Sequence, residues 1–193
     1  MAAGKRTTPP IQGQEETLSP TLEQLVERGR QGDVDAFREL FERYGQRVYR
    51  YAHSRLGRAE DAQDAAQDVF LAAWQGLPSF HYEHPGSFPG WLFGIARNVV
   101  AEHHRRAFRR RWVGLDEVPE GSVEFEGRLL SQRVLLEELG RLPETQREVL
   151  MLRFVAGLPA REVGTAVGKS EAAVVSLQVR GLEALRRRLG RLA

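Results

Sequence analysis

Three carboxylates and four histidines are the residues of this sequence best suited to metal chemistry. Asp61, Asp64 and Asp68 recur at three- and four-residue intervals, which places them on one face of a helix. The imidazoles that could join them belong to His81, His84, His103 and His104. A hard cation needs a second, facing group of carboxylates, and no comparable aspartate pair occurs nearby. The pattern disfavours a metal-dependent enzyme, and taken alone it is more typical of a solvated helix face than of a docking surface.

Two stretches of opposite charge stand out against a net charge of only +2. Residues 103–112, HHRRAFRRRW, are strongly basic, and residues 116–127, DEVPEGSVEFEG, are acidic. A basic run of this kind suits the phosphate backbone of a nucleic acid, although a solvated charge run is the common alternative. Neighbouring motifs must therefore decide what the basic stretch binds.

Residues 158–189 have the pattern of a helix-turn-helix, in which a short helix and a glycine-containing turn precede a longer helix that opens at Ser170. The second helix would enter the major groove of DNA while the first supports it. Apolar residues at 163, 166, 174 and 177 would pack the two helices together. The residues that would then face bases or phosphates are Arg147, Arg161, Lys169, Ser170, Glu171, Ala172, Val175, Ser176, Val179 and Arg180. An ordinary helical hairpin is the alternative.

The composition and the absence of cysteine exclude several classes of protein. Without cysteine, the 193-residue chain has no disulfide, no thiolate zinc site and no cysteine nucleophile. No apolar run approaches the roughly 20 residues that span a bilayer, and the amino terminus lacks a signal-peptide core. We therefore expect a cytoplasmic protein without membrane insertion, and no cofactor or bound metal is expected.

The elements that must position these residues are all predicted to be helices. Apolar periodicity indicates helices from residue 21, at 34–56, at 59–75 and from about residue 89, then at 129–139, 143–155, 159–166 and 170–189. On the second helix the apolar face includes Phe41. On the fourth, Trp91 has core spacing whereas Phe93 falls off the apolar face.

The predicted fold class is all-α, with two small helical domains joined by a flexible acidic linker and a helix-turn-helix in the second domain. The predicted boundaries are a tail at 1–18, a first domain at 19–112, a linker at 113–128 and a second domain at 129–193. The linker is either a nucleic-acid mimic or a solubilising spacer, and its composition does not separate the two.

Three segments in a fixed order resemble a known family. AEDAQDAAQDVFLAAW at 59–74 resembles region 2.2 of bacterial sigma factors of the sigma-70 family, and FPGWLFGIARNVVAEHHRR at 88–106 resembles regions 2.3 and 2.4. RLPETQREVLMLRFVAGLPAREV at 141–163 resembles region 4. The resemblance covers residues 22–189, and the lack of a further domain between the two parts resembles the extracytoplasmic-function (ECF) group.

The resemblance implies a non-enzymatic factor that binds core RNA polymerase and directs initiation at promoters in response to stress or a signal. Its implied partners are the clamp helices and flap region of the polymerase, promoter DNA and an anti-sigma factor. Core-polymerase binding would fall to Asp61, Asp64, Gln67, Asp68 and Trp74. Contacts with the unpaired minus-ten strand would fall to Phe80, His81, Arg97, Asn98, His103, Arg105 and Arg106.

One departure from the family pattern limits what can be said of promoter choice. The family often has a basic residue near position 175, where this chain has Val175. The identity of the minus-thirty-five sequence is therefore left open. The remaining alternative is a stand-alone helix-turn-helix regulator, which explains only the second domain.

Overall fold

The first group of helices comprises residues 20–112, and each helix begins where the local sequence satisfies its first amide groups. In this computed structural model, which describes residues 20–112 and 134–190, α1 (Leu22–Arg30) starts with a capping box between Thr21 and Gln24. Asp33 caps α2 (Val34–Leu56) by accepting from two backbone amides, and Gly57 ends it in the left-handed conformation. Then come α3 (Ala59–Gly76), the 3-10 turn η1 (Leu77–Ser79) and α4 (Ser87–Trp112).

The second group of helices comprises residues 134–190. Residues 134–140 are helical and are followed by α6 (Glu144–Leu150), which continues as the π-helical turn η2 (Met151–Val155). After these come α7 (Ala160–Val167) and α8 (Glu171–Leu189). Across the described ranges no strand occurs, which agrees with the predicted all-α class, and no helix is both long and apolar enough to cross a bilayer.

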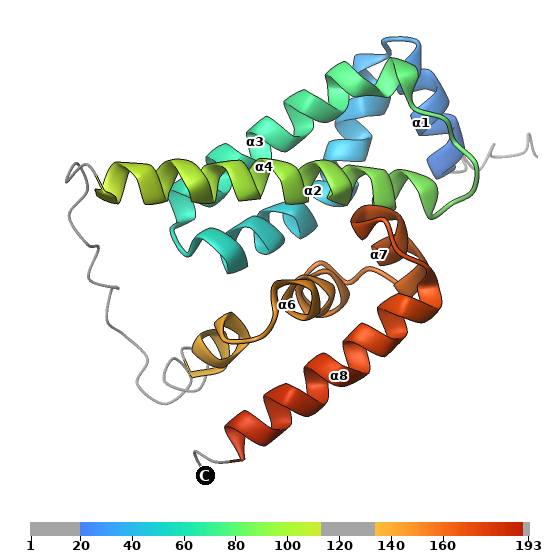
Figure 1. Cartoon of the computed structure of the whole chain (residues 1–193). Helices are drawn as coiled ribbons and strands as arrows, with labels where there is room; N and C mark the ends of the chain where they lie inside the picture. Colours follow the sequence, from blue (N-terminus) through green and yellow to red (C-terminus); the bar gives the residue numbers. More distant parts are fainter. Residues whose placement is uncertain (1–19, 113–133, 191–193) are drawn as a thin grey trace, which may run out of the picture.

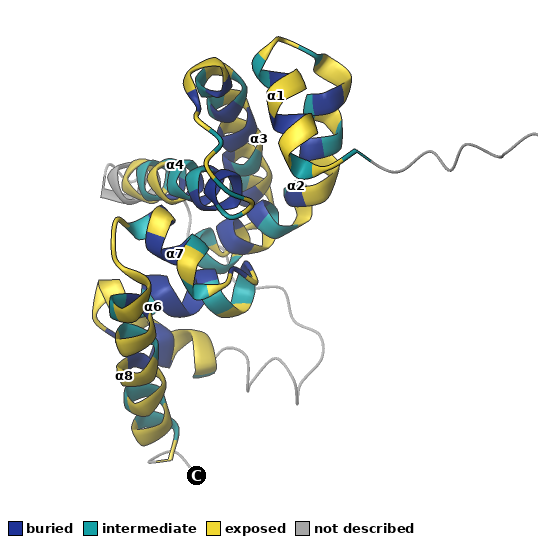
Figure 2. Ribbon diagram, turned by 90° about the vertical axis from the view of Figure 1, so that its right-hand side faces the viewer, coloured by how far each residue is buried: buried dark blue, intermediate teal, exposed yellow. Residues whose placement is uncertain are grey.

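The long helix α4 lies between the two groups. It packs against α2 and α3 on one side, and α7 packs closely against it on the other. In Figure 1, α1, α3 and the amino-terminal part of α2 lie above α4, α2 crosses behind α4, and the second group lies below it, with α7 under the amino-terminal half of α4. The burial colours of Figure 2 show buried residues on α4 and on the parts of α6 and α7 nearest to it, while most of α8 is exposed.

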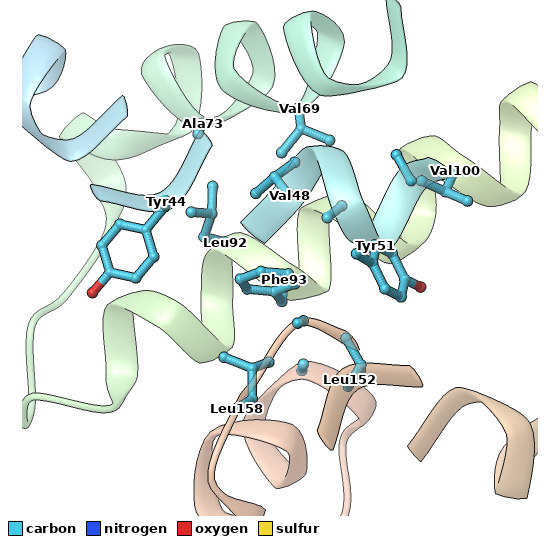
Figure 3. Packing of buried hydrophobic residues seen from close by; sticks show 14 of the residues in the cluster. Tyr44, Val48, Tyr51, Val69, Ala73, Leu92, Phe93, Val100, Leu152 and Leu158 are labelled. Atoms are coloured by element: carbon cyan, nitrogen blue, oxygen red, sulfur yellow. The ribbon is translucent and has the colours of Figure 1, made fainter. Parts of the chain in front are cut away.

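The buried core runs through both groups without a break. Phe93 of α4 is fully buried and packs edge-on against Tyr51 of α2, with ring centroids 6.0 Å apart. Figure 3 shows Leu152 and Leu158 of the second group on the far side of Phe93. These two leucines are also fully buried, so the two groups share apolar surface.

Two aromatic residues differ from the expectation drawn from periodicity. Phe41 was predicted to be core but is 47% exposed, although its ring packs on that of Phe70 with centroids 4.7 Å apart. Phe93 was predicted to lie off the buried face, but it is fully buried, because Tyr51 of α2 packs on it and the second group covers its far side. Trp91, predicted as core, is half-buried and stacks on Phe80 at 4.7 Å.

The predicted helix boundaries were close. The fourth helix starts at Ser87, two residues before Pro89, which stands in the first turn as expected. The predicted helix at 143–155 is present, with its last turn widened to a π-helix. The predicted tail at 1–18 and the predicted linker at 113–128 lie outside the described residues, so the domain boundaries stay predictions.

Candidate polymerase and nucleic-acid interfaces

The acidic face of α3 forms one side of a shallow cleft, and basic residues of α4 form the other. The cleft is lined by Asp61, Asp64, Gln67, Asp68, His103 and Arg106. His103 Nε2 lies 2.8 Å from Asp68 Oδ2, and the His103 side chain is only 16% exposed whereas that of Asp68 is 51% exposed. The structure thus joins a residue predicted to bind polymerase to one predicted to bind DNA. His103 is held by Asp68 and presents little surface to a phosphate.

The outer surface of α3 also carries apolar groups that the sequence prediction missed. Leu71 is 56% exposed on the same helix as the acidic residues. Trp74, predicted to bind polymerase, is half-buried and packs edge-on against Phe37 with centroids 4.8 Å apart. An exposed leucine beside carboxylates makes a mixed surface, which suits a protein partner better than a metal ion. No cluster of three metal-ligating side chains occurs within the part of the chain that the structure describes.

The loop before α4 and the first half of α4 place the predicted minus-ten residues at different depths. Phe80 is buried and packs on Phe88 and Trp91, with ring centroids 5.9 and 4.7 Å away. His81 is exposed in the loop. The loop is held by Ser87, whose hydroxyl donates to the carbonyl of residue 84 at 2.7 Å. In this conformation His81 can meet a base, whereas Phe80 stabilises the loop from inside.

The basic side chains of α4 are exposed but are not all free. Arg97 and Asn98 are exposed, and Arg97 Nη1 lies 3.4 Å from the carbonyl oxygen of Ala166 in α7. Arg105 and Arg106 are exposed and pair with Glu102 at 2.7 and 3.1 Å. Such surface pairs contribute little to stability and are easily exchanged for phosphate contacts. The cationic side of α4 can therefore follow a nucleic-acid backbone, except where α7 covers it.

Helices α7 and α8 meet through a tight turn. Gly168 has a left-handed conformation, and the hydroxyl of Ser170 accepts from the backbone amide of Ala173 at 3.3 Å, which caps α8. Val163 and Val174 are fully buried between the helices, as predicted. This packing leaves residues 171, 172, 175 and 176 of α8 exposed.

The exposed side of α8 carries most of the predicted minus-thirty-five residues. Among the exposed residues are Arg161, Lys169, Ser170, Glu171, Ala172, Val175, Ser176, Val179 and Arg180. Val175, Val179 and Leu182 form an apolar stripe along this side, being 46%, 48% and 40% exposed. Arg147 is different, because its side chain is 26% exposed and pairs with Glu144. Burial, and then the charge of Arg55, lower the pKa of Arg147.

Family models match both groups of helices. Sigma-70 region 2 matches residues 40–110, and sigma-70 region 4 matches residues 139–187. The chain belongs to the sigma-70 family. The ECF RNA polymerase sigma factor BldN of Streptomyces coelicolor is 37% identical over 180 residues, which cover 89% of this chain and 67% of BldN. The ECF sigma factor SigD of Mycobacterium tuberculosis is 36% identical over 175 residues, covering 86% of this chain and 82% of SigD.

Solved structures of sigma factors have the same fold. The chain resembles CnrH, in its complex with the cytosolic domain of CnrY, with a TM-score of 0.69, 28% identity and coverage of 88% of this chain and 97% of CnrH. It resembles RpoE of Bartonella quintana, in its complex with the anti-sigma factor NepR, with a TM-score of 0.61, 22% identity and coverage of 81% and 98%. This sigma factor is thus an alternative, ECF-type factor that directs transcription initiation.

Proposed function

We propose that the first group of helices docks on core RNA polymerase and holds the unpaired minus-ten strand, while α7 and α8 read the minus-thirty-five duplex. The observation that carries this assignment is the exposed amino-terminal half of α8, supported from behind by α7 through Val163 and Val174. A helix with one side exposed in this way fits a major groove. The action is regulatory rather than catalytic, and it takes place in the cytoplasm, where polymerase and promoters are.

Docking on polymerase rests on the outer face of α3. Asp64 and Asp68 are exposed there beside the exposed side chain of Leu71. Carboxylates steer a basic partner toward the surface, and the apolar side chain supplies contact area once the partner has bound. The fitting partner is therefore a basic helical surface of the polymerase.

Strand capture rests on the loop before α4 and on the cationic side of α4. Unpaired bases need aromatic or apolar surface for stacking, and their backbone needs a positive track. The exposed His81 and the exposed Arg97, Asn98, Arg105 and Arg106 provide the polar part of such a site. An anti-sigma partner is also expected, since the similar RpoE is seen in complex with NepR.

The test is transcription in vitro from a library of genomic fragments, with core polymerase in the presence and absence of this chain. Promoter-specific transcripts that need both components are expected, and Asp64→Ala/Asp68→Ala should reduce them by weakening core binding. Glu42→Ala, which removes an exposed carboxylate from a different cleft on α2, should not. A chain that footprints duplex DNA alone and gives no transcript with core would instead be a stand-alone regulator.

A further inference from the structure

The amino-terminal half of α8 has almost no side chain that can read a purine. Residues 171–179 are EAAVVSLQV, and Gln178 is the one member of this run with an amide or a cationic head group. Gln178 is half-buried, and its Oε1 atom accepts a hydrogen bond from Nε of Arg153 at 2.8 Å. Paired hydrogen bonds to guanine or adenine in the major groove come from arginine, lysine, asparagine or glutamine. Residues 171–179, all of which the structure describes, therefore offer no free group of that kind.

The same side of α8 presents apolar groups instead. Val175 and Val179 are 46% and 48% exposed, and they lie four residues apart on the helix. Four residues advance an α-helix by about 6 Å, and successive base pairs are about 3.4 Å apart, so the two valines span roughly two base steps. The 5-methyl group of thymine is the apolar group that base edges present in the major groove. The exposed valines therefore match thymine better than any other base.

The opposite side of α8 packs so closely that the valines are fixed on the exposed side. A Cβ atom built on the buried Gly181 of α8 would lie 3.0 Å from Cδ1 of Leu150 in α6. A Cβ atom built on Gly164 of α7 would lie 2.6 Å from the carbonyl oxygen of Lys169, in the turn before α8. Close packing of this kind leaves little freedom for the helix to rotate. A methyl contact needs such a fixed side chain, because it depends on shape alone.

The charges around the two valines favour duplex DNA over an apolar protein partner. Exposed cationic side chains surround them, whereas the exposed acidic residues of α8 are Glu171 and Glu183; the cationic residues are Arg161, Lys169, Arg180, Arg186 and Arg187. Nε of Arg180 donates to the carbonyl oxygen of Ser176 at 3.3 Å, so Arg180 lies along the helix rather than across it. Cationic side chains at the margins of a helix suit the phosphates on either side of a groove. The apolar side chains between them then face the bases.

We infer that Val175 and Val179 select thymine by contact with its 5-methyl group. The minus-thirty-five element of this sigma factor then contains A·T pairs at two positions about two base pairs apart, with their thymine methyl groups against the two valines. The inference rests on the proposed function, in which α8 enters the minus-thirty-five duplex. It adds the chemical group that is recognised, which is a methyl group rather than the hydrogen-bonding edge of a purine.

The experiment removes the methyl groups from the DNA. Deoxyuridine pairs with adenine as thymidine does and lacks only the 5-methyl group. A promoter fragment recovered by transcription in vitro is resynthesised with deoxyuridine in the minus-thirty-five element of both strands and with thymidine elsewhere. The holoenzyme, assembled from core polymerase and the full chain, should bind this template about fourfold more weakly for each methyl contact that is lost. Competition between the thymine and uracil templates measures this ratio directly.

The matching change in the protein is Val175→Ala/Val179→Ala. The double variant should bind the thymine template more weakly than the parent chain does, and it should bind the thymine and uracil templates with nearly equal affinity. Val34→Ala is the matched control, because it makes the same truncation at a valine of α2 that is 61% exposed. This control should keep the parent's preference for thymine. Alanine favours helix formation at all three positions, so circular dichroism should report intact folding.

Three results would overturn the inference and leave the proposed function intact. The first is equal affinity of the parent holoenzyme for the two templates. The second is an unchanged preference for thymine in Val175→Ala/Val179→Ala, which would mean that uracil acts through the shape of the duplex. The third is a double variant that fails to assemble with core polymerase, which would make the two valines a protein contact. Absence of promoter-specific transcripts with the parent chain would instead contradict the proposed function, and this inference with it.

Discussion

Removing the Tyr51 hydroxyl should weaken the contact between the two helix groups without disturbing the fold of either one. In Tyr51→Phe the ring remains, so its edge-on packing against Phe93 at 6.0 Å is kept. The hydrogen bond to the buried Glu148 is lost. Burial, then the charge of Glu148 and the hydrogen bond to it, raise the pKa of Tyr51 well above its ordinary value, so the phenol remains a donor at neutral pH.

The free-energy cost of Tyr51→Phe depends on the partners that Glu148 retains after the hydroxyl is removed. Its remaining partner, Arg55, lies 3.6 Å from the carboxylate and is already paired with Glu144 at 2.7 Å. Loss of a hydrogen bond to a charged, buried acceptor costs about 1.5 to 3 kcal/mol. When the two helix groups separate, water can hydrogen-bond to Glu148 in place of the hydroxyl. The substitution therefore destabilises only the closed form, in which the two groups are in contact. At about 1.4 kcal/mol per factor of ten, the ratio of closed to open molecules should fall about ten- to a hundredfold.

The assay is fluorescence transfer between dyes attached at Gln63→Cys and Glu183→Cys, two exposed positions in a chain with no cysteine of its own, with Tyr49→Phe as the matched control. Tyr49 lies on the same helix and is half-buried, and its ring lies 5.8 Å from that of His53 within the first group. Tyr49→Phe should leave the transfer unchanged. Equal transfer in the two phenylalanine variants would mean that the Tyr51–Glu148 bond does not hold the groups together.

Three further changes test the core, a helix cap and the DNA surface. Leu152→Ala, at a fully buried position, should lower the free energy of unfolding by about 2 to 5 kcal/mol in urea titrations, and a loss below that range would mean that the site collapses around the cavity. Hydrogen bonds from the Ala36 amide and then from Arg28 lower the pKa of Asp33 below its ordinary value of 3.8. The ionised Asp33 therefore stabilises the fold at pH values above 3.8, and this stabilisation is lost as the pH falls through the lowered pKa. Asp33→Asn should therefore lower the urea midpoint at neutral pH and weaken its decline in acid. Arg180→Ala should weaken binding to the promoter duplex. The slope of the logarithm of the binding constant against the logarithm of the salt concentration should become shallower by about one, and an unaltered footprint would place the recognition surface elsewhere.

Local signals in the sequence predicted the helices well because they depend on neighbouring residues only. Asp33 accepts amide hydrogen bonds from the residues two and three positions later, and Gly57 adopts the left-handed conformation that ends α2. Both features are visible as an N-cap and a C-terminal glycine in the sequence. The exposed side of α8 was predictable for the same reason, since helical periodicity places Ser176 and Arg180 together.

The relations that the sequence did not reveal join residues far apart in the chain. Phe93 falls off the apolar face of its helix and is nevertheless buried, because the second group covers it, whereas Phe41 lies on an apolar face and is 47% exposed. The pair between Asp68 and His103 spans 35 residues, and the contact from Arg47 to Ala156 spans 109. Periodicity reports which side of a helix is apolar. It carries no information on which distant helix covers that side.

Gly90 shows how a local cost and a distant contact are balanced in the same helix. Alanine would favour helix formation at this position by about 1 kcal/mol, so local stability alone does not account for the glycine. The glycine is explained by the contact with α7, because Thr165 of α7 leaves no room for a Cβ at position 90. Gly90→Ala should therefore stabilise the helix α4 and destabilise the contact between α4 and α7. Because the two effects have opposite signs, the substitution separates the stability of the helix from the stability of the contact between the two groups.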